Sequence, residues 1–315
     1  MKNIVFVLFL ILLAGCGGST GAKKSEVKQQ IQKKSIQNES EAKNNTNKKS
    51  VVDESLDTNT THQIFIIGDS TVNFSNDHRD VDHKSRVGWG EVIGEITKGE
   101  VYNRARGGAS ARAFRFCPRP TQAGDDLWTL SFGKNLDLDW DGAKSVLDSY
   151  AKKGDYLFIQ FGANDEHHYG KAANCGFGDI HGVEAFKEDY KKQLKYYINE
   201  ARKKGMIPVL ITPINPRHYK NSGDIQEVRE PYVSYTKEVA DEENVIFLDL
   251  FHKSVDEFNK LQCNSGNIDP YGPCEVGPNW HIDSTHLLKG GAIEVAKWLK
   301  ELACNKDENL CKEFK

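Results

Sequence analysis

A chain of 315 residues, 38% of them hydrophobic and 10% aromatic, is long enough to form one large domain or two small ones around a real core. Its mean hydropathy of -0.59 indicates that a polar segment dilutes that core. The formal net charge is -3 at pH 7. The first 61 residues are net positive, so residues 62–315 carry a net charge of about -6. This balance argues against nucleic acid as a partner.

Residues 1–16 have the layout of a bacterial lipoprotein signal peptide. Lys2 precedes an apolar run over residues 4–13 that is too short to span a bilayer comfortably. The sequence LAGC at 13–16 matches a lipobox, in which Cys16 is lipidated and becomes the new N-terminus. An ordinary cleaved signal peptide is the alternative. We therefore expect a lipoprotein of the bacterial cell envelope, held to a membrane through Cys16 and facing the periplasm or the exterior.

Residues 17–61 consist mostly of Lys, Asn, Gln, Ser, Thr and Glu. Such a segment cannot bury enough apolar area to offset the entropy lost on ordering, so it predicts a disordered polar tether. The string GGSTG at 17–21 matches a G-x-S-x-G nucleophile motif, but it opens the tether instead of following a strand and is rejected. A globular domain over 62–303 and a disulfide-closed tail over 304–315 are expected to follow.

From residue 63 onward, β-rich runs alternate with amphipathic helical patterns. The predicted strands cover residues 63–67, 100–103, 156–161, 207–212 and 245–250. Helical spacing of apolar residues covers 183–201, 232–240 and 288–299, and Gly205 stands where a helix-terminating glycine belongs. Buried strands separated by helices predict a parallel sheet covered on both faces, with the functional site at the carboxyl ends of the strands.

Three of these strand ends and one later segment carry candidate catalytic residues. Ser70 follows the first strand at a strand-to-helix turn, where it is either a nucleophile or an ordinary N-cap. Gly107-Gly108 follows the second strand, and Asn164 follows the third, where its amide is either a hydrogen-bond donor to a ligand or part of an Asx-turn. Asp283 stands three residues before His286, so its carboxylate can accept Nδ1–H and leave Nε2 free as a base.

Taken together, these stretches resemble the SGNH/GDSL hydrolases and, within them, the rhamnogalacturonan acetylesterase group. The resemblance covers about residues 62–303, and the matching blocks are GDST at 68–71, GWGE at 88–91, NRARGGASAR at 103–112, QFGAND at 160–165 and DSTHLLKGGA at 283–292. It implies an α/β fold, a three-layer α/β/α sandwich with a parallel flavodoxin-like sheet.

The same resemblance assigns a role to each residue of the site. Ser70 is implied as the nucleophile, with Asp283 and His286 completing the triad. The Ser70 and Gly108 backbone N–H groups and the Asn164 side chain are implied as the oxyanion hole. Group members commonly have His between Gly and Asn in the QFGAND block, whereas this chain has Ala163, which predicts altered substrate contacts.

Six cysteines remain once Cys16 is set aside, and an even number in an exported chain predicts three disulfides among fifteen possible connectivities. Short separations favour Cys263–Cys274 and Cys304–Cys311, which leaves Cys117 with Cys175.

Other side chains are candidates for substrate or metal contacts. Trp89 and Trp280 are candidates for sugar stacking, although core packing is the favoured interpretation for any single Trp. Arginines cluster around the second block, where most are expected to be solvated and one or two to pair with uronic-acid carboxylates; they are Arg104, Arg106, Arg112, Arg115 and Arg119. Arg112 is the preferred candidate among them. The His78–His83 loop has metal-ligating side chains, but a solvated loop is the favoured interpretation, so no metal is expected.

The sequence therefore predicts a serine carbohydrate esterase that removes O-acetyl groups from a polysaccharide, pectic or otherwise, by two-step acyl transfer to water. No cofactor is needed, and a monomer is expected. The alternatives are an esterase acting on acetylated cell-envelope glycans or small esters, and a non-catalytic carbohydrate-binding lipoprotein.

Overall fold

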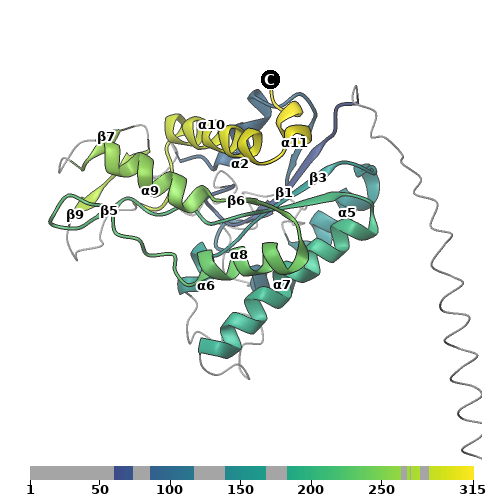
Figure 1. Cartoon of the computed structure of the whole chain (residues 1–315), viewed down its shortest axis with the longest axis horizontal. Helices are drawn as coiled ribbons and strands as arrows, with labels where there is room; N and C mark the ends of the chain where they lie inside the picture. Colours follow the sequence, from purple (N-terminus) through teal and green to yellow (C-terminus); the bar gives the residue numbers. More distant parts are fainter. Residues whose placement is uncertain are drawn as a thin grey trace, which may run out of the picture. The chain divides into compact units, whose positions relative to one another are not determined.

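A five-stranded parallel sheet forms the centre of the computed structural model (Figure 1). Its strands stand in the order β2 (Val101–Asn103), β1 (Ile64–Gly68), β3 (Tyr156–Gln160), β4 (Ile207–Ile211) and β6 (Ile246–Leu248). This is the flavodoxin-like order, in which the chain moves outward first to one side of β1 and then to the other. The predicted fold class is thereby confirmed, and all five strands lie within two residues of their predicted bounds.

The structure describes residues 60–73, 86–116, 139–167, 183–263, 268–269, 271–276 and 284–315. Within these ranges, no helix combines the length and the apolar character that crossing a membrane requires.

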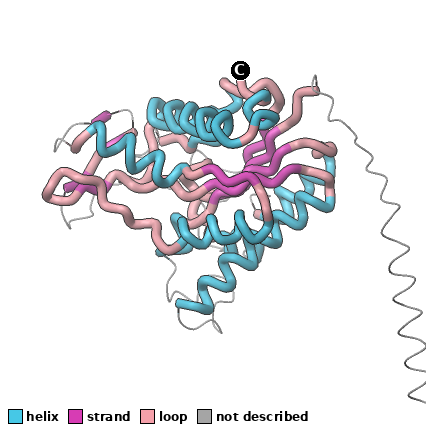
Figure 2. Tube along the Cα trace, in the orientation of Figure 1, coloured by secondary structure: helices cyan, strands magenta, loops and turns pink. Residues whose placement is uncertain are grey.

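Helices cover both faces of the sheet, as Figures 1 and 2 show. On one face lie α2 (Trp89–Val92), the short 3₁₀ helix η2 (Ile93–Glu95), α9 (Leu250–Leu261), α10 (Lys289–Lys306) and α11 (Glu308–Lys312). On the other lie α3 (Ala111–Phe116), α5 (Trp140–Tyr150), α7 (Val183–Lys203) and α8 (Tyr232–Glu243). The short helix α6 (Ala163–His167) follows β3 directly.

Side chains along the central strands point alternately to the two faces of the sheet, which divides the core into two halves. Ile64 and Ile66 of β1 pack with the α2, α9 and α10 layer, whereas Phe65 and Ile67 pack with the α3, α5, α7 and α8 layer. Successive side chains of a strand point to opposite faces, so a strand buried on both faces is apolar throughout. Every residue of β1 is buried, as this arrangement requires.

Two small two-stranded sheets stand outside the main one. β5 (His218–Tyr219) pairs in parallel with β9 (Glu275–Val276), and β7 (Ile268–Asp269) pairs antiparallel with β8 (Gly272–Pro273). The Cys263–Cys274 disulfide joins the end of α9 to this region, which confirms that predicted pair. Gly205 follows α7 with a φ of 70°, as a helix-terminating glycine does.

The C-terminal segment differs from the tail expected at 304–315. Helix α10 continues to Lys306, and the predicted Cys304–Cys311 disulfide ties it to α11. Phe314 is buried, and the Lys98 N–H donates to the Glu313 carbonyl at 2.8 Å. The domain therefore extends to the last residue. Cys16, the tether and the Cys117–Cys175 pair lie outside the described residues.

Candidate active site

Ser70 and His286 meet at the carboxyl edge of the sheet although 216 residues separate them in the chain. His286 Nε2 lies 2.8 Å from Ser70 Oγ, in the range of a hydrogen bond. Ser70 follows the end of β1 and is largely buried, whereas His286 is only partly buried. A hydroxyl in contact with an imidazole nitrogen is the arrangement in which the imidazole can remove the hydroxyl proton.

Backbone hydrogen bonds hold the loop that carries His286. The Val87 N–H donates to the Leu287 carbonyl at 2.9 Å, and Arg86 forms a β-bridge with Leu288. On the other side of His286, the Arg217 N–H donates to the Ser284 carbonyl at 3.0 Å. These contacts hold the backbone on both sides of His286, before α10 begins.

The turn that carries Ser70 is organised by Asp69. The Asp69 carbonyl accepts the Val72 and Asn73 N–H groups at 3.2 and 3.1 Å. Its carboxylate Oδ1 accepts both the Thr71 N–H at 2.9 Å and the Thr71 hydroxyl at 2.7 Å. Ser70 thus lies in a tight turn in which the residues on either side of it, Asp69 and Thr71, are hydrogen-bonded to each other.

A buried hydrogen-bond chain supports this turn from beneath. Trp89 Nε1 donates to Gln160 Oε1 at 2.8 Å, and Gln160 Nε2 donates to the Thr71 hydroxyl at 2.6 Å, which in turn donates to Asp69. Trp89 is fully buried. The favoured interpretation, core packing, is therefore confirmed for Trp89, and its candidacy for sugar stacking is wrong, because the ring fills the core and its N–H belongs to this chain.

Burial dominates the electrostatics of Asp69. It raises the pKa of the Asp69 carboxyl, while the hydrogen bonds from Thr71 and the charges of Arg229 and His286 oppose that rise. Among the described residues, no hydrogen-bond partner reaches Asp69 Oδ2. The Thr71 hydrogen bonds, followed by the charges of Arg229 and His286, therefore favour the ionised form of the Asp69 carboxyl beside the nucleophile.

Two further loops bring the expected oxyanion donors to the same edge. The Arg106 N–H donates to the Gly68 carbonyl at 2.9 Å, which lays the loop after β2 against the end of β1. Gly108 in that loop has a φ of 72°, a conformation that favours glycine. Asn164 Nδ2 donates one hydrogen to the Ala109 carbonyl at 3.2 Å, and among the described residues no hydrogen bond from its second amide hydrogen is seen.

Asp165, the next residue, ties the same loops together. Its carboxylate accepts the Ala111 N–H at 3.1 and 3.2 Å and the Gly162 N–H at 3.0 Å. The residue as a whole is half-buried, but its carboxyl group is enclosed, and this burial raises its pKa to about 8 despite the Ala111 hydrogen bond. Sequence reasoning missed both Asp165 and Gln160. The signal for Gln160 was a lone polar residue at the end of the apolar strand YLFIQ.

The other predicted contacts have different outcomes. Arg112 pairs with Asp189 at 2.8 Å and lies over the Phe116 ring, so its charge is already balanced within the protein. Asp283, Trp280 and the His78–His83 loop lie outside the described residues, and their roles stay predictions. Within the ranges that the structure describes, no cluster of three or more His, Cys, Asp or Glu residues could hold a metal ion.

Comparison with known proteins agrees with this geometry. The family model described as GDSL-like lipase/acylhydrolase matches residues 64–299. The probable rhamnogalacturonan acetylesterase YesY of Bacillus subtilis strain 168 is 30% identical over 259 residues, which cover 79% of this chain and 98% of YesY. Rhamnogalacturonan acetylesterase RhgT of the same strain is 28% identical over 254 residues, covering 76% and 88%.

Among solved structures, that of YxiM from Bacillus subtilis superimposes with a TM-score of 0.52 at 22% identity. The aligned region covers 78% of this chain and 57% of the YxiM chain, and this likeness concerns the fold alone. The family match spans the sheet, the Ser70 turn, the segments that carry Gly108 and Asn164, and the His286 loop. The chain therefore belongs to the GDSL lipase/acylhydrolase family and is a carboxylic ester hydrolase.

Proposed function

We propose that this protein removes acetyl groups from an O-acetylated polysaccharide of the pectic, rhamnogalacturonan type, with Ser70 as nucleophile. The observation that carries the proposal is the 2.8 Å contact between Ser70 Oγ and His286 Nε2 at the sheet edge. The names of the two Bacillus relatives, both rhamnogalacturonan acetylesterases, support the substrate class.

In the first step, Ser70 Oγ attacks the acetyl carbonyl carbon while His286 Nε2 takes the hydroxyl proton. The carbonyl oxygen becomes an oxyanion, which accepts hydrogen bonds from the Ser70 and Gly108 N–H groups and from the second Asn164 amide hydrogen. When the tetrahedral intermediate collapses, His286 returns the proton to the departing sugar oxygen. The products are a free sugar hydroxyl and an acetylated Ser70.

In the second step, water replaces the sugar. His286 Nε2 removes a proton from water, the hydroxide attacks the acetyl-serine carbonyl, and the same donors stabilise the second oxyanion. Collapse releases acetate and returns the proton to Ser70 Oγ. Each oxyanion donor is expected to contribute about 10²–10³-fold to turnover.

The role of Asp283 belongs to this proposal as well. A carboxylate that accepts Nδ1–H from His286 would fix the tautomer in which Nε2 is the base. We also propose that the protein acts in the cell envelope as a lipoprotein anchored at Cys16, a placement supported by the lipobox LAGC at 13–16.

Acetate release from a panel of acetylated polysaccharides tests the substrate class. The panel includes acetylated rhamnogalacturonan, homogalacturonan, xylan and a bacterial cell-wall glycan. We expect the fastest release from the first. Faster release from the cell-wall glycan would favour the envelope alternative, and failure of a fluorophosphonate probe to label Ser70 would favour a non-catalytic binding protein.

A further inference from the structure

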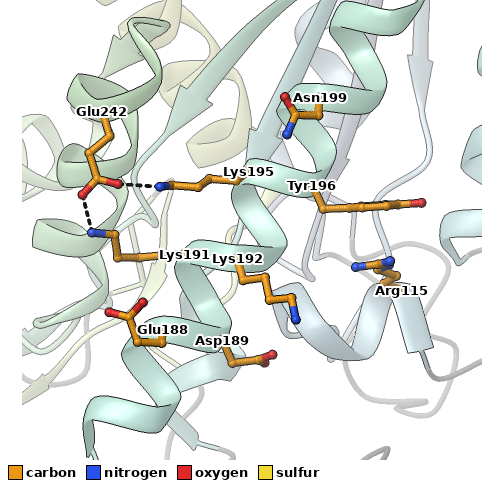
Figure 3. Close-up of a pocket in the computed structure, with 9 residues that line it drawn as sticks. All are labelled: Arg115, Glu188, Asp189, Lys191, Lys192, Lys195, Tyr196, Asn199 and Glu242. Atoms are coloured by element: carbon orange, nitrogen blue, oxygen red, sulfur yellow. Dashed lines mark hydrogen bonds and ion pairs between the residues drawn. The ribbon is translucent and has the colours of Figure 1, made fainter. Parts of the chain in front are cut away.

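A pocket of about 940 Å³ opens over α7 where this helix faces α3 on one side and α8 on the other (Figure 3). Ser70 and His286 do not line it. Charged side chains dominate its walls, which makes it a candidate site for a polar ligand.

The half of the pocket facing α8 is internally neutralised. Lys191 and Lys195 of α7 both reach the Glu242 carboxylate of α8, at 2.5 and 2.7 Å (Figure 3). Lys191 also pairs with Glu238 at 3.0 Å. These cations already have carboxylate partners and offer little to a ligand.

The half facing α3 is different. We call Arg115, Lys192 and Tyr196, which line this half, together with the Phe116 ring beside Arg115, the Arg115 lobe. The Arg115 guanidinium lies 3.4 Å from the centroid of the Tyr196 ring and 4.6 Å from that of Phe116. It donates a hydrogen bond to the neutral Gln193 side chain at 3.1 Å. Among the described residues, no carboxylate pairs with it.

Stacking prepares Arg115 for a ligand. The Tyr196 hydroxyl accepts the Trp140 Nε1–H at 3.0 Å, which fixes the ring that supports the guanidinium. A stacked guanidinium has lost much of its rotamer freedom before binding, and its remaining N–H groups form a planar fork that matches a carboxylate. The geometry is therefore that of a preorganised carboxylate receptor.

The other charges of the lobe favour an anion. Lys192 is exposed and makes no ion pair with any described residue. Asp189 is engaged by Arg112 at 2.8 Å and by Gln193 at 3.0 Å. Figure 3 shows Glu188 on the opposite side of the pocket from Arg115. Two cations thus face solvent with no carboxylate of their own among the residues described.

The lobe also has an apolar surface, and α3 connects the lobe to the loop that carries Gly108. Phe116 is 45% exposed, so its ring can cover the C–H face of a sugar. Gly108 precedes Arg115 by seven residues, and α3 spans most of that interval. At ~1.5 Å per helical residue, the six residues of α3 span about 9 Å, the scale of a short oligosaccharide.

We propose that the Arg115 lobe binds the carboxylate of a uronic-acid residue in the polysaccharide whose acetyl group lies at Ser70. Arg115 and Lys192 pair with the carboxylate, and Phe116 packs on the sugar ring. This inference rests on the proposed function, because it supplies the acidic-sugar recognition that a pectic substrate requires.

Calorimetric titration of the Ser70→Ala protein with non-acetylated oligogalacturonate tests the lobe without any catalytic turnover. In this background, Arg115→Gln and Lys192→Gln should each weaken binding about tenfold, as expected for losing one charge-assisted contact. Arg115→Lys keeps the positive charge but not the planar guanidinium, so its affinity for oligogalacturonate should lie between those of the parent and Arg115→Gln. Lys297→Gln removes a charge from α10 in the opposite layer and should leave binding unchanged. A neutral oligosaccharide of equal length should bind the same to all variants.

Binding of oligogalacturonate that is no tighter than that of the neutral oligosaccharide would overturn the inference. Equal binding by Arg115→Gln, Lys192→Gln and the parent would overturn it too. Circular dichroism checks the fold of each variant, and exposed Lys192 keeps the test valid if Arg115→Gln does not fold. The proposed function is judged separately, by acetate release from acetylated polysaccharides by the wild-type protein. Failure there with intact uronate binding would refute the polysaccharide acetylesterase proposal and leave uronate binding at the lobe established.

Discussion

Replacing Thr71 with valine removes one hydroxyl from the buried chain between Trp89 and Asp69 and preserves the shape of the side chain. Thr71 is almost fully buried and takes part in two hydrogen bonds through that hydroxyl, at 2.6 Å from Gln160 and 2.7 Å to Asp69. The substitution leaves the Gln160 amide without an acceptor and deprives the Asp69 carboxylate of one donor.

The expected cost follows from those two groups. A buried polar group that loses its partner costs ~1–3 kcal/mol, so two of them cost about 2–6 kcal/mol. That is a large share of the ~5–15 kcal/mol by which proteins are usually stable. Because Thr71 adjoins Ser70, relaxation of the turn also displaces the nucleophile, and a shift of ~1 Å can lower turnover by about 10²-fold.

Urea unfolding and turnover of a chromogenic acetyl ester measure the two effects. Thr71→Ser is the matched control, since it keeps the hydroxyl and removes only a methyl group, at ~1 kcal/mol. The reasoning is refuted if Thr71→Val is as stable and as active as Thr71→Ser, because the hydroxyl would then contribute nothing.

Two further substitutions examine the oxyanion loops. Asn164→Ala should lower kcat for the chromogenic ester about 10²–10³-fold with little change in KM, because a hydrogen-bond donor to the transition state is lost. An unchanged kcat would exclude Asn164 from the oxyanion hole. Asp165 has a pKa near 8 in the folded protein against an ordinary 3.8, so the native state keeps a proton that the unfolded chain has lost, and stability falls as the pH rises from about 4 to about 8. Asp165→Asn does not titrate and should show a shallower fall in urea unfolding over this range, whereas parallel pH profiles would contradict the buried position of the carboxyl group.

Local patterns in the sequence predict much of the fold. The apolar runs at 64–68, 156–160 and 207–211 are strands because both faces of a covered parallel sheet require apolar side chains. Cys263–Cys274 and Cys304–Cys311 follow from short loop closures, which need no knowledge of the tertiary fold.

Contacts between distant segments explain where prediction fails. Trp89 lies on a one-turn helix whose inward orientation depends on Gln160, 71 residues away. The charged segment 304–315 looks like a tail, yet Phe314 forms a β-bridge with Thr97. Neither contact leaves a periodic trace in the sequence. Asp165 is similar, since its partners on Ala111 and Gly162 are backbone groups that no motif identifies.

The most direct test of the proposed mechanism is the turnover of a chromogenic acetyl ester by purified Ser70→Ala, with circular dichroism to confirm the fold. If Ser70 and His286 act as one unit, Ser70→Ala and His286→Ala should each lose ~10³-fold or more of the activity while remaining folded. Near-wild-type turnover by folded Ser70→Ala would contradict the assignment of Ser70 as the nucleophile.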